Sequence, residues 1–248
     1  MRTIAGLFFT ASVKAGTGFY TFNEIVQMKT FFFVNSFILL CAATEVQAQK
    51  KMTDGTIVYD IVIESSNPTQ KSPDFTGAVT TVYLNGDKCR TDMVSSLGIE
   101  STIYDASSGK AVILKEYSGQ KLMITLTKEN WAEKNNSYNG LVFETVNETK
   151  LIAGYHCNKA IAKMDNGKSY IVYYTTELQA STKEYNPLFR NLPGMPMEYE
   201  IVKGRSKFRY TVAKINLDAV AASTFDFPKS GYRVMTYEEN KEMKKLDQ

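Results

Sequence analysis

A hairpin between Gly154 and Thr176 is the sequence feature that most constrains the fold of this chain. Asn166-Gly167 lies between two β-prone runs, and this dipeptide accepts the positive φ angles of a type I′ turn. With the turn at that point, Ile161 faces Val172 across the hairpin, and alternate side chains point to opposite faces. The residues predicted on one face are Ile161, Tyr170, Val172 and Tyr174, and those on the other are Ala160, Ala162, Met164, Ile171 and Tyr173. Both faces would be apolar, so we expect other segments or a ligand to cover the hairpin on both sides.

Residues 28–48 have the three parts of a secretory signal peptide. Lys29 supplies the positive start, the run 31–43 is apolar, and Val46-Gln47-Ala48 offers small residues before a cleavage site. The apolar run is too short to span a membrane, and the order of the parts favours a signal over a buried core helix. We therefore predict cleavage before Gln49 and an exported protein that is periplasmic or associated with the outer membrane.

Cys41 and residues 1–27 are the remaining features of this end of the chain. Cys41 raises the question of a lipoprotein signal, but the residue before a lipidated cysteine is normally small and Leu40 is not, so we do not expect lipidation. Residues 1–27 precede the predicted signal, which indicates that Met28 is the true start and that the upstream extension is a start-site artefact. A disordered extension is the alternative.

The chain after the predicted cleavage site, 49–248, is long enough for one domain with a sizeable core. It carries 26 basic and 24 acidic residues, and this balance gives no sign of a surface that binds nucleic acid. One basic patch alternates along a predicted strand, which favours a solvated strand face over a site for anionic lipid headgroups. The patch consists of Lys203, Arg205, Lys207 and Arg209.

Cys89 and Cys157 are the cysteines that remain after cleavage. An exported chain with an even pair permits a disulfide. Closing so long a loop would stabilise the fold by about 4 kcal/mol in the chain-entropy model. Since spacing does not show whether the two residues meet, a bridge and two free thiols are both left open.

From Gly55 onward the sequence alternates between β-prone runs and turn residues. Turns recur about every eight to twelve residues, which favours an antiparallel sheet over βαβ units with helical crossovers. Besides the hairpin, the predicted strands are 56–64, 79–84, 88–94, 101–105, 110–117, 121–127, 141–146, 197–203 and 206–217, and the predicted helices are 128–135 and 236–245.

Some of these strands are apolar on one face only, whereas others, such as 56–64, are apolar on both. A closed barrel or a sandwich would alternate more cleanly, whereas a strongly curved sheet wrapped round helices or a ligand has central strands that are apolar on both sides. We therefore predict a mainly β domain, a strongly curved antiparallel half-barrel with a few short helices over its concave face. The segments expected to supply the cover are 176–191, which is polar and partly helical, and 218–227, which is apolar.

Three stretches resemble known families. Residues 152–160 (IAGYHCNKA), a tyrosine-rich strand and then Leu192-Pro193-Gly194 resemble the Bacteroidetes exported family named after its GLPGLI motif, and also a sister family of unknown function. Asn191 stands where that motif begins with glycine and Met195-Pro196 where it closes with Leu-Ile, so the sister family fits better. Residues 223–232 (STFDFPKSGY) are similar to the end of the periplasmic lipoprotein carriers and outer-membrane lipoprotein receptors.

The resemblance to the carriers implies a half-open, curved antiparallel barrel with helices in its concavity. It also implies a hydrophobic cavity, which in the carriers takes up acyl chains. It brings no catalytic residues, and the recognition residues of the carriers do not match this sequence position by position.

The sequence contains no complete catalytic or metal-binding motif. His156 is the single histidine, and its neighbour Cys157 would point to the opposite face of a strand, so the two would not form a dyad. No G-x-S-x-G elbow supports a serine triad, the cysteines and the histidine lack zinc-site spacing, and no phosphate loop is complete. We expect no enzyme activity, no metal and no cofactor.

Aromatic residues and methionines gather in the last two hairpins and in the loop between them. Such side chains adapt to irregular apolar ligands and could line a lipid-binding hollow, although each one taken singly is better explained as core. The candidate ligand-binding residues are Tyr170, Tyr173, Tyr174, Met195, Met197, Tyr199, Phe208 and Tyr210.

The sequence thus favours a non-enzymatic extracytoplasmic protein that binds a lipid, a lipoprotein acyl chain or another hydrophobic ligand. The alternative is a cell-envelope interaction module whose hollow is filled by its own side chains and whose partner is another envelope protein. A cavity of several hundred Å³ favours the first, and close packing favours the second.

Overall fold

The computed structural model describes residues 12–15, 18–21, 49–65, 77–164, 168–203 and 206–246. The chain divides into two compact units, Met1–Gln47 and Ala48–Gln248. In the first unit the described residues form an antiparallel hairpin of β1 (Ser12–Ala15) and β2 (Gly18–Thr21), within the predicted extension 1–27. The predicted signal peptide, 28–48, lies outside the described residues.

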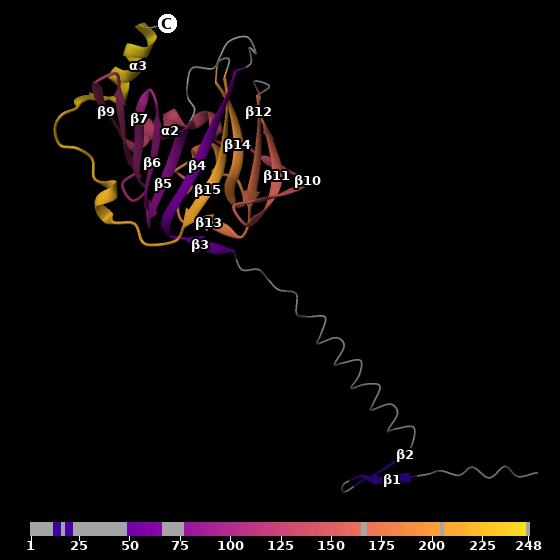
Figure 1. The fold of residues 1–248 in the computed structure, drawn as a ribbon. Coiled ribbons are helices and arrows are strands. Elements are labelled where there is room, and N and C mark those ends of the chain that lie inside the picture. The colour runs from indigo at the N-terminus through magenta and orange to yellow at the C-terminus, as the bar shows by residue number, and fades with distance from the viewer. Residues whose placement is uncertain are drawn as a thin grey trace, which may run out of the picture. The chain divides into compact units, whose positions relative to one another are not determined.

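The second unit is mainly β and is built on one mixed sheet of twelve strands that does not close (Figure 1). The strands are β4 (Asp54–Ser65), β5 (Ala78–Asn85), β6 (Lys88–Ser95), β7 (Gly98–Asp105), β8 (Lys110–Tyr117), β9 (Gln120–Leu126), β10 (Phe143–Ile152), β11 (Tyr155–Lys163), β12 (Ser169–Thr175), β14 (Met195–Lys203), β15 (Ser206–Asn216) and β16 (Arg233–Thr236). Their order across the sheet is β10-β11-β12-β14-β15-β4-β5-β6-β7-β8-β9-β16. A short parallel pair, β3 (Lys50–Met52) with β13 (Leu178–Ala180), and the helices α2 (Lys128–Lys134) and α3 (Tyr237–Leu246) accompany the sheet.

The expectation of a wholly antiparallel sheet is wrong at one edge. β16 runs parallel to β9, whereas the other neighbouring strands of the described sheet are antiparallel. Parallel neighbours need a connection longer than a hairpin turn, and β9 and β16 are joined by the chain from 127 to 232. The sheet is therefore mixed.

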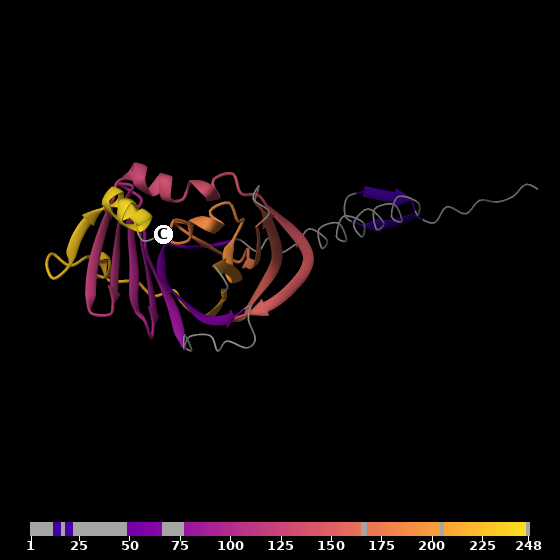
Figure 2. The same ribbon diagram turned by 90° about the horizontal axis from the view of Figure 1, so that it is seen from above.

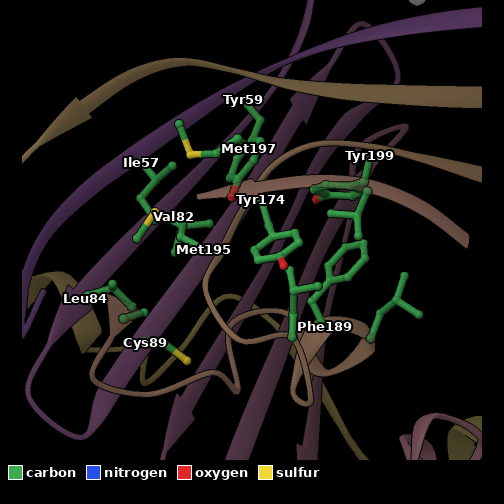
Figure 3. Packing of buried hydrophobic residues seen from close by; sticks show 14 of the residues in the cluster. Ile57, Tyr59, Val82, Leu84, Cys89, Tyr174, Phe189, Met195, Met197 and Tyr199 are labelled. Atoms are coloured by element: carbon green, nitrogen blue, oxygen red, sulfur yellow. The ribbon is translucent and has the colours of Figure 1, made fainter. Parts of the chain in front are cut away.

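One face of the sheet carries the large core, and we call it the inner face. Along β5 the residues alternate between buried and half-buried, as expected when one face packs and the other does not. Helix α2 and the segment 177–195 lie over the inner face (Figure 2), and Trp131, Leu188 and Phe189 from these elements join the core cluster. Figure 3 shows Phe189 beside Tyr199 of β14, with ring centroids 4.7 Å apart.

Leu192-Pro193-Gly194, the motif-like stretch of the sequence, lies at the end of this covering segment. Leu192 is completely buried, whereas Pro193 is exposed. A Cβ atom on Gly194 would lie 2.0 Å from the backbone oxygen of Thr175, so no larger residue fits between the segment and β12. Close packing of the segment against the sheet therefore explains why position 194 is a glycine.

The hairpin of β11 and β12 is present, but its predicted register is wrong by one residue. Ile161 pairs with Ile171 and Ala160 with Val172. The Met164 amide donates to the Lys168 carbonyl at 2.8 Å, so three residues lie between this bonded pair, whereas the predicted turn had two between its paired residues. The predicted turn itself lies outside the described residues. This slip places Val172 on the same face as Ala160, which is the buried face.

The second face of these central strands is open to solvent, so cover on both sides is not needed there. Ile171 is 37% exposed, Val62 on β4 is 55% exposed and Val202 on β14 is 66% exposed. Scattered apolar residues on a protein surface are common and need no cover. The expectation that apolar second faces must be buried is therefore wrong for this half of the sheet.

Ion pairs occupy the same outer face where β14, β15 and β4 adjoin. Lys207 Nζ lies 3.2 Å from carboxylate oxygens of both Glu64 and Glu200, and Arg209 Nε lies 2.9 Å from Glu200. Such exposed pairs contribute little to stability, but they keep the face solvated. Of the predicted basic patch, Arg205 and the side chain of Lys203 lie outside the described residues.

The two predicted covering segments pack on opposite faces of the sheet. Residues 176–191 contain β13 and a 3-10 turn, Pro187–Phe189, where a partly helical segment was expected, and they cover the inner face. Residues 218–227 pack on the outer face through Phe225, which contacts Ile103, Leu114 and Met123. The predicted helices near 128–135 and 236–245 are confirmed as α2 and α3.

Strand β10 forms one edge of the sheet. A β-bulge between Val146 and Thr149 interrupts its pairing with β11. Most of the strand is exposed, including its charged residues Glu144, Glu148 and Lys150. The edge is thus long, irregular and charged.

Cys89 on β6 and Cys157 on β11 are free thiols, and both are buried. The disulfide between them, which the sequence left open, is therefore not formed. Five strands lie between β6 and β11 in the sheet, whereas a disulfide needs Cα atoms within about 7 Å. Burial raises the pKa of Cys89 to about 12 and that of Cys157 to about 11. Both thiols are therefore unreactive core side chains at neutral pH.

In a full chain carrying Cys41→Ser, we expect two thiols to react with an aromatic disulfide reagent after unfolding without reductant. In the native protein we expect almost none to react, because burial keeps both thiols protonated and out of reach. Counting reactive thiols in the two states checks this. An absence of thiols in the unfolded protein, with two appearing only after reduction, would restore the bridge.

Candidate functional site

A cavity of about 220 Å³ lies on the inner face, between the sheet and the covering segment. Six neighbouring strands, from β14 across to β7, contribute to its wall, and the covering segment contributes Tyr185 and Asn186. The strand residues that line it are Tyr59, Thr80, Val82, Thr91, Met93, Glu100, Thr102, Tyr199, Ile201 and Tyr210.

One wall of the cavity is aromatic. Tyr199 and Tyr210 are cross-strand partners whose rings stack with centroids 4.7 Å apart and planes 10° apart. Tyr59 meets Tyr199 edge to face at 5.7 Å, and its hydroxyl donates to the Pro196 carbonyl at 2.8 Å. These contacts fix the ring positions and leave a rigid apolar surface towards the cavity.

The opposite wall is formed by two rows of cross-strand neighbours on β5, β6 and β7. One row contains Val82, Thr91 and Thr102, and the next contains Thr80, Met93 and Glu100. Because all of these side chains point to the inner face, the wall combines methyl groups with three hydroxyls and one carboxylate.

Glu100 is the ionisable group at the solvent side of this wall, where its side chain keeps 35% of its surface exposed. Lys115 Nζ lies 3.0 Å from Glu100 Oε2, and the Tyr117 hydroxyl donates to the same oxygen at 3.4 Å. Burial, and then the charge of Glu100, raise the pKa of Tyr117 to about 12. Both contacts use one carboxylate oxygen.

Burial also sets the ionisation of the tyrosines in and around the cavity. It raises the pKa of Tyr59, Tyr185 and Tyr199 well above the ordinary tyrosine value. Burial, with a smaller effect of the nearby Glu100 charge, also raises the pKa of Tyr210. These side chains are neutral hydrogen-bonding groups at physiological pH.

Glu184 fixes the covering segment above the cavity. Its carboxylate accepts two hydrogen bonds from Arg190, at 2.7 and 2.8 Å, and one from Trp131 Nε1 of α2 at 2.7 Å. Arg190 Nη1 also donates to Asn139 at 2.9 Å, and the Trp131 ring stacks on Tyr104 of β7 at 4.8 Å. One carboxylate thus joins the segment to α2 and, through α2, to the sheet.

The predicted ligand-binding residues divide into three groups. Tyr199 and Tyr210 line the cavity. Tyr173 lies on the outer face, where it hydrogen-bonds to Glu148 and lies beneath the Lys159 ammonium. The others face the inner side, where Tyr174, Met195 and Met197 are buried core, Tyr170 packs against this core, and Phe208 is half-buried outside it.

The sequence did not single out several lining residues. The lining threonines, one each on β5, β6 and β7, look like ordinary strand residues in the sequence, and the covering segment was expected to be partly helical. These missed residues are Thr80, Thr91, Thr102, Glu100, Tyr185 and Asn186.

His156 and Cys157 point in different directions. The His156 side chain is 90% exposed, with Nδ1 3.5 Å from Glu177, whereas Cys157 is buried. Among the described residues no group of three or more histidine, cysteine or acidic side chains could hold a metal ion. The described helices include none long and apolar enough to cross a membrane.

No family model matches this chain, and no curated protein gives a significant match. Similar solved structures include PNGF-II in its C2 and P21 crystal forms, at TM-scores of 0.46 and 0.45 and identities of 13% and 15% over 76% of this chain. An uncharacterized conserved protein from Thermus thermophilus has a TM-score of 0.44 and 10% identity over 75% of this chain and 91% of its own. The chain spans about a third of the length of PNGF-II, 32% and 33% in the two forms. Likeness at this level assigns neither a family nor an activity.

Glu184→Ala should destabilise the fold by about 2–3 kcal/mol, because Arg190 and Trp131 Nε1 both lose their half-buried charged acceptor. Urea unfolding at neutral pH measures the free energy. Glu148→Ala is the matched control, since it removes an exposed carboxylate that contacts Lys159, and we expect little change. If the two variants were equally stable, the hydrogen bonds of Glu184 would not be what holds the covering segment in place.

Stability should fall at alkaline pH because of the buried tyrosines. Their folded-state pKa values lie above the unfolded value near 10, so the unfolded chain loses protons first as the pH rises. The stabilisation is fully present below about pH 10 and falls above it, by about 1.4 kcal/mol per pH unit for each such tyrosine. Unfolding followed by tyrosinate absorbance tests this, with Tyr199→Phe giving a flatter fall. Titration of every tyrosine near pH 10 in a folded protein would contradict it.

Proposed function

We propose that this protein is a non-enzymatic extracytoplasmic binding protein that takes a lipid, a lipoprotein acyl chain or another hydrophobic ligand. In this proposal the sheet is a strongly curved half-barrel of the lipoprotein-carrier kind, and its inner face is the hollow. Export rests on the predicted signal peptide at 28–48. The observation that carries the proposal is the tyrosine-walled cavity between the sheet and the covering segment.

The size of the cavity limits which part of a ligand it can hold. A cavity of about 150 Å³ holds benzene, and drug-sized ligands occupy about 300–1,000 Å³. At about 220 Å³, the inner cavity suits one ring, a branched group or the end of an acyl chain. The rest of the ligand would extend past Glu100 towards solvent.

The chemistry of the lining selects a ligand end without negative charge. The aromatic wall of Tyr199 and Tyr210 offers an apolar surface, and Glu100 Oε1 would accept a hydrogen bond from a ligand hydroxyl or amine. No lysine or arginine is among the described residues that line the cavity. A carboxylate or phosphate head would therefore be repelled from it.

A second candidate function is an envelope interaction module with a self-filled core. The specific observation in its favour is the close packing beside the cavity, where Val172, Leu192, Met195 and Met197 are 0–1% exposed. Most of the inner face is thus occupied by the chain's own side chains. In this case the cavity would be a packing defect without a ligand.

Two neighbouring substitutions separate these candidates. Ile201 lines the cavity, whereas Val202 is 66% exposed on the opposite face of the same strand. Ile201→Trp should fill the cavity and weaken binding of the neutral fluorescent probe 1-aminoanthracene by at least about tenfold, whereas Val202→Trp should leave it unchanged. Fluorescence titration of the purified full chain measures both.

Native mass spectrometry of protein isolated from its own cells provides the second readout. A bound hydrophobic molecule that is retained by Val202→Trp and lost from Ile201→Trp supports the proposal. Protein that is always empty, together with equal probe binding by both variants, favours the self-filled module.

A further inference from the structure

A second, larger cavity, of about 380 Å³, lies beneath the segment Phe225-Asp226-Phe227 on the outer side of β7, β8 and β9. Its floor is a row of cross-strand neighbours, Ile103, Val112 and Thr125. Ile103 is on the face opposite to Tyr104, which belongs to the core of the inner face. Tyr104, Ala111 and Leu126 of that core also contribute to the lining of this pocket, but the two cavities share no lining residue.

The segment Phe225-Asp226-Phe227, which covers the outer pocket, is buried at its first residue and exposed at its last. Phe225 is 5% exposed and packs on Ile103, whereas Phe227 is 48% exposed at the edge of the pocket. The Thr224 carbonyl accepts a hydrogen bond from Arg90 Nη1 of β6 at 2.9 Å, which fixes the segment to the sheet just before Phe225. An exposed phenylalanine beside a cavity gives a ligand apolar surface that the free protein leaves in water.

A charged row closes one end of the pocket. Lys88, Asp105 and Lys110 are cross-strand neighbours on β6, β7 and β8, and all three line the cavity. Asp105 is engaged in its own turn, where the Ser107 amide donates to it at 2.9 Å and the Ser107 hydroxyl at 2.5 Å. Among the described residues neither lysine takes part in an ion pair. Two exposed ammonium groups thus flank one carboxylate, and with two positive groups and one negative group the row keeps a single net positive charge.

We propose that the outer pocket binds a single-chain anionic amphiphile, with its chain between Phe227 and Val112 and its acidic head between Lys88 and Lys110. This goes beyond the function proposed for the inner cavity and does not depend on it. The volume lies within the range of ordinary ligand pockets. The head is a carboxylate or a phosphate, because either accepts hydrogen bonds from two ammonium groups.

Asp226 gives the proposal its sharpest internal control. It lines the pocket from the roof and is exposed, so its carboxylate repels an acidic head. Removing its charge should strengthen binding, whereas removing the lysine charges should weaken it. A nonspecific apolar pocket would respond to neither change.

The experiment compares three probes of equal chain length: dodecanoate, dodecyl phosphate and dodecyltrimethylammonium, each below its micelle concentration. Calorimetric titrations use the full chain with the inner cavity blocked by Ile201→Trp, or saturated with 1-aminoanthracene if that variant does not fold. We expect the two anions to bind at least about tenfold more tightly than the cation, and less tightly as salt is raised. If the two anions bind with similar affinity, the pocket accepts either head group. If one anion binds more tightly, its head group, carboxylate or phosphate, is the one that the natural ligand carries.

Substitutions then locate the binding. Lys88→Gln with Lys110→Gln should weaken anion binding by about tenfold, Asp226→Asn should strengthen it, and Phe227→Ala should weaken all three probes. The matched charge control is Lys163→Gln with Lys214→Gln, two exposed lysines away from the pocket, which should change nothing. Equal binding of the cation and the anions, or equal effects of the two lysine pairs, would overturn the proposal.

Discussion

The hydrogen bonds of Glu184 are the constraint on which the rest of the structure depends. They tie an irregular segment to α2, and the two together keep water from the inner side of the sheet. Without this cover the apolar inner residues of the central strands would be exposed, and an open sheet has no second layer of its own to bury them. The cavity lies between this cover and the sheet.

Most strands could be predicted from the sequence because alternation and turn residues are local signals. β8 was expected at 110–117 and is found at Lys110–Tyr117. The register of the β11–β12 hairpin could not be predicted in the same way, since one additional connecting residue moved every pairing by one position. The expectation of cover on both faces came from the assumption that apolar residues must be buried, since both faces of the hairpin are apolar in either register.

The sequence predicted only some of the residues that line the candidate site. Tyr199 and Tyr210 stood out because they are aromatic and belong to one predicted hairpin. Their counterparts Thr91, Thr102 and Glu100 come from strands about a hundred positions earlier and are ordinary strand residues by type. The covering segment was expected to be partly helical, whereas its short strand, its 3-10 turn and its contacts follow from tertiary packing.

The edge strand β10 has a consequence for how copies of this protein behave towards one another. Its outer backbone groups are a template on which another extended chain could polymerise. The bulge between Val146 and Thr149 breaks the even spacing that such templating needs, and the charges of Glu144, Glu148 and Lys150 make close approach unfavourable. An unclosed sheet can therefore persist in a crowded compartment as separate molecules instead of growing into fibres.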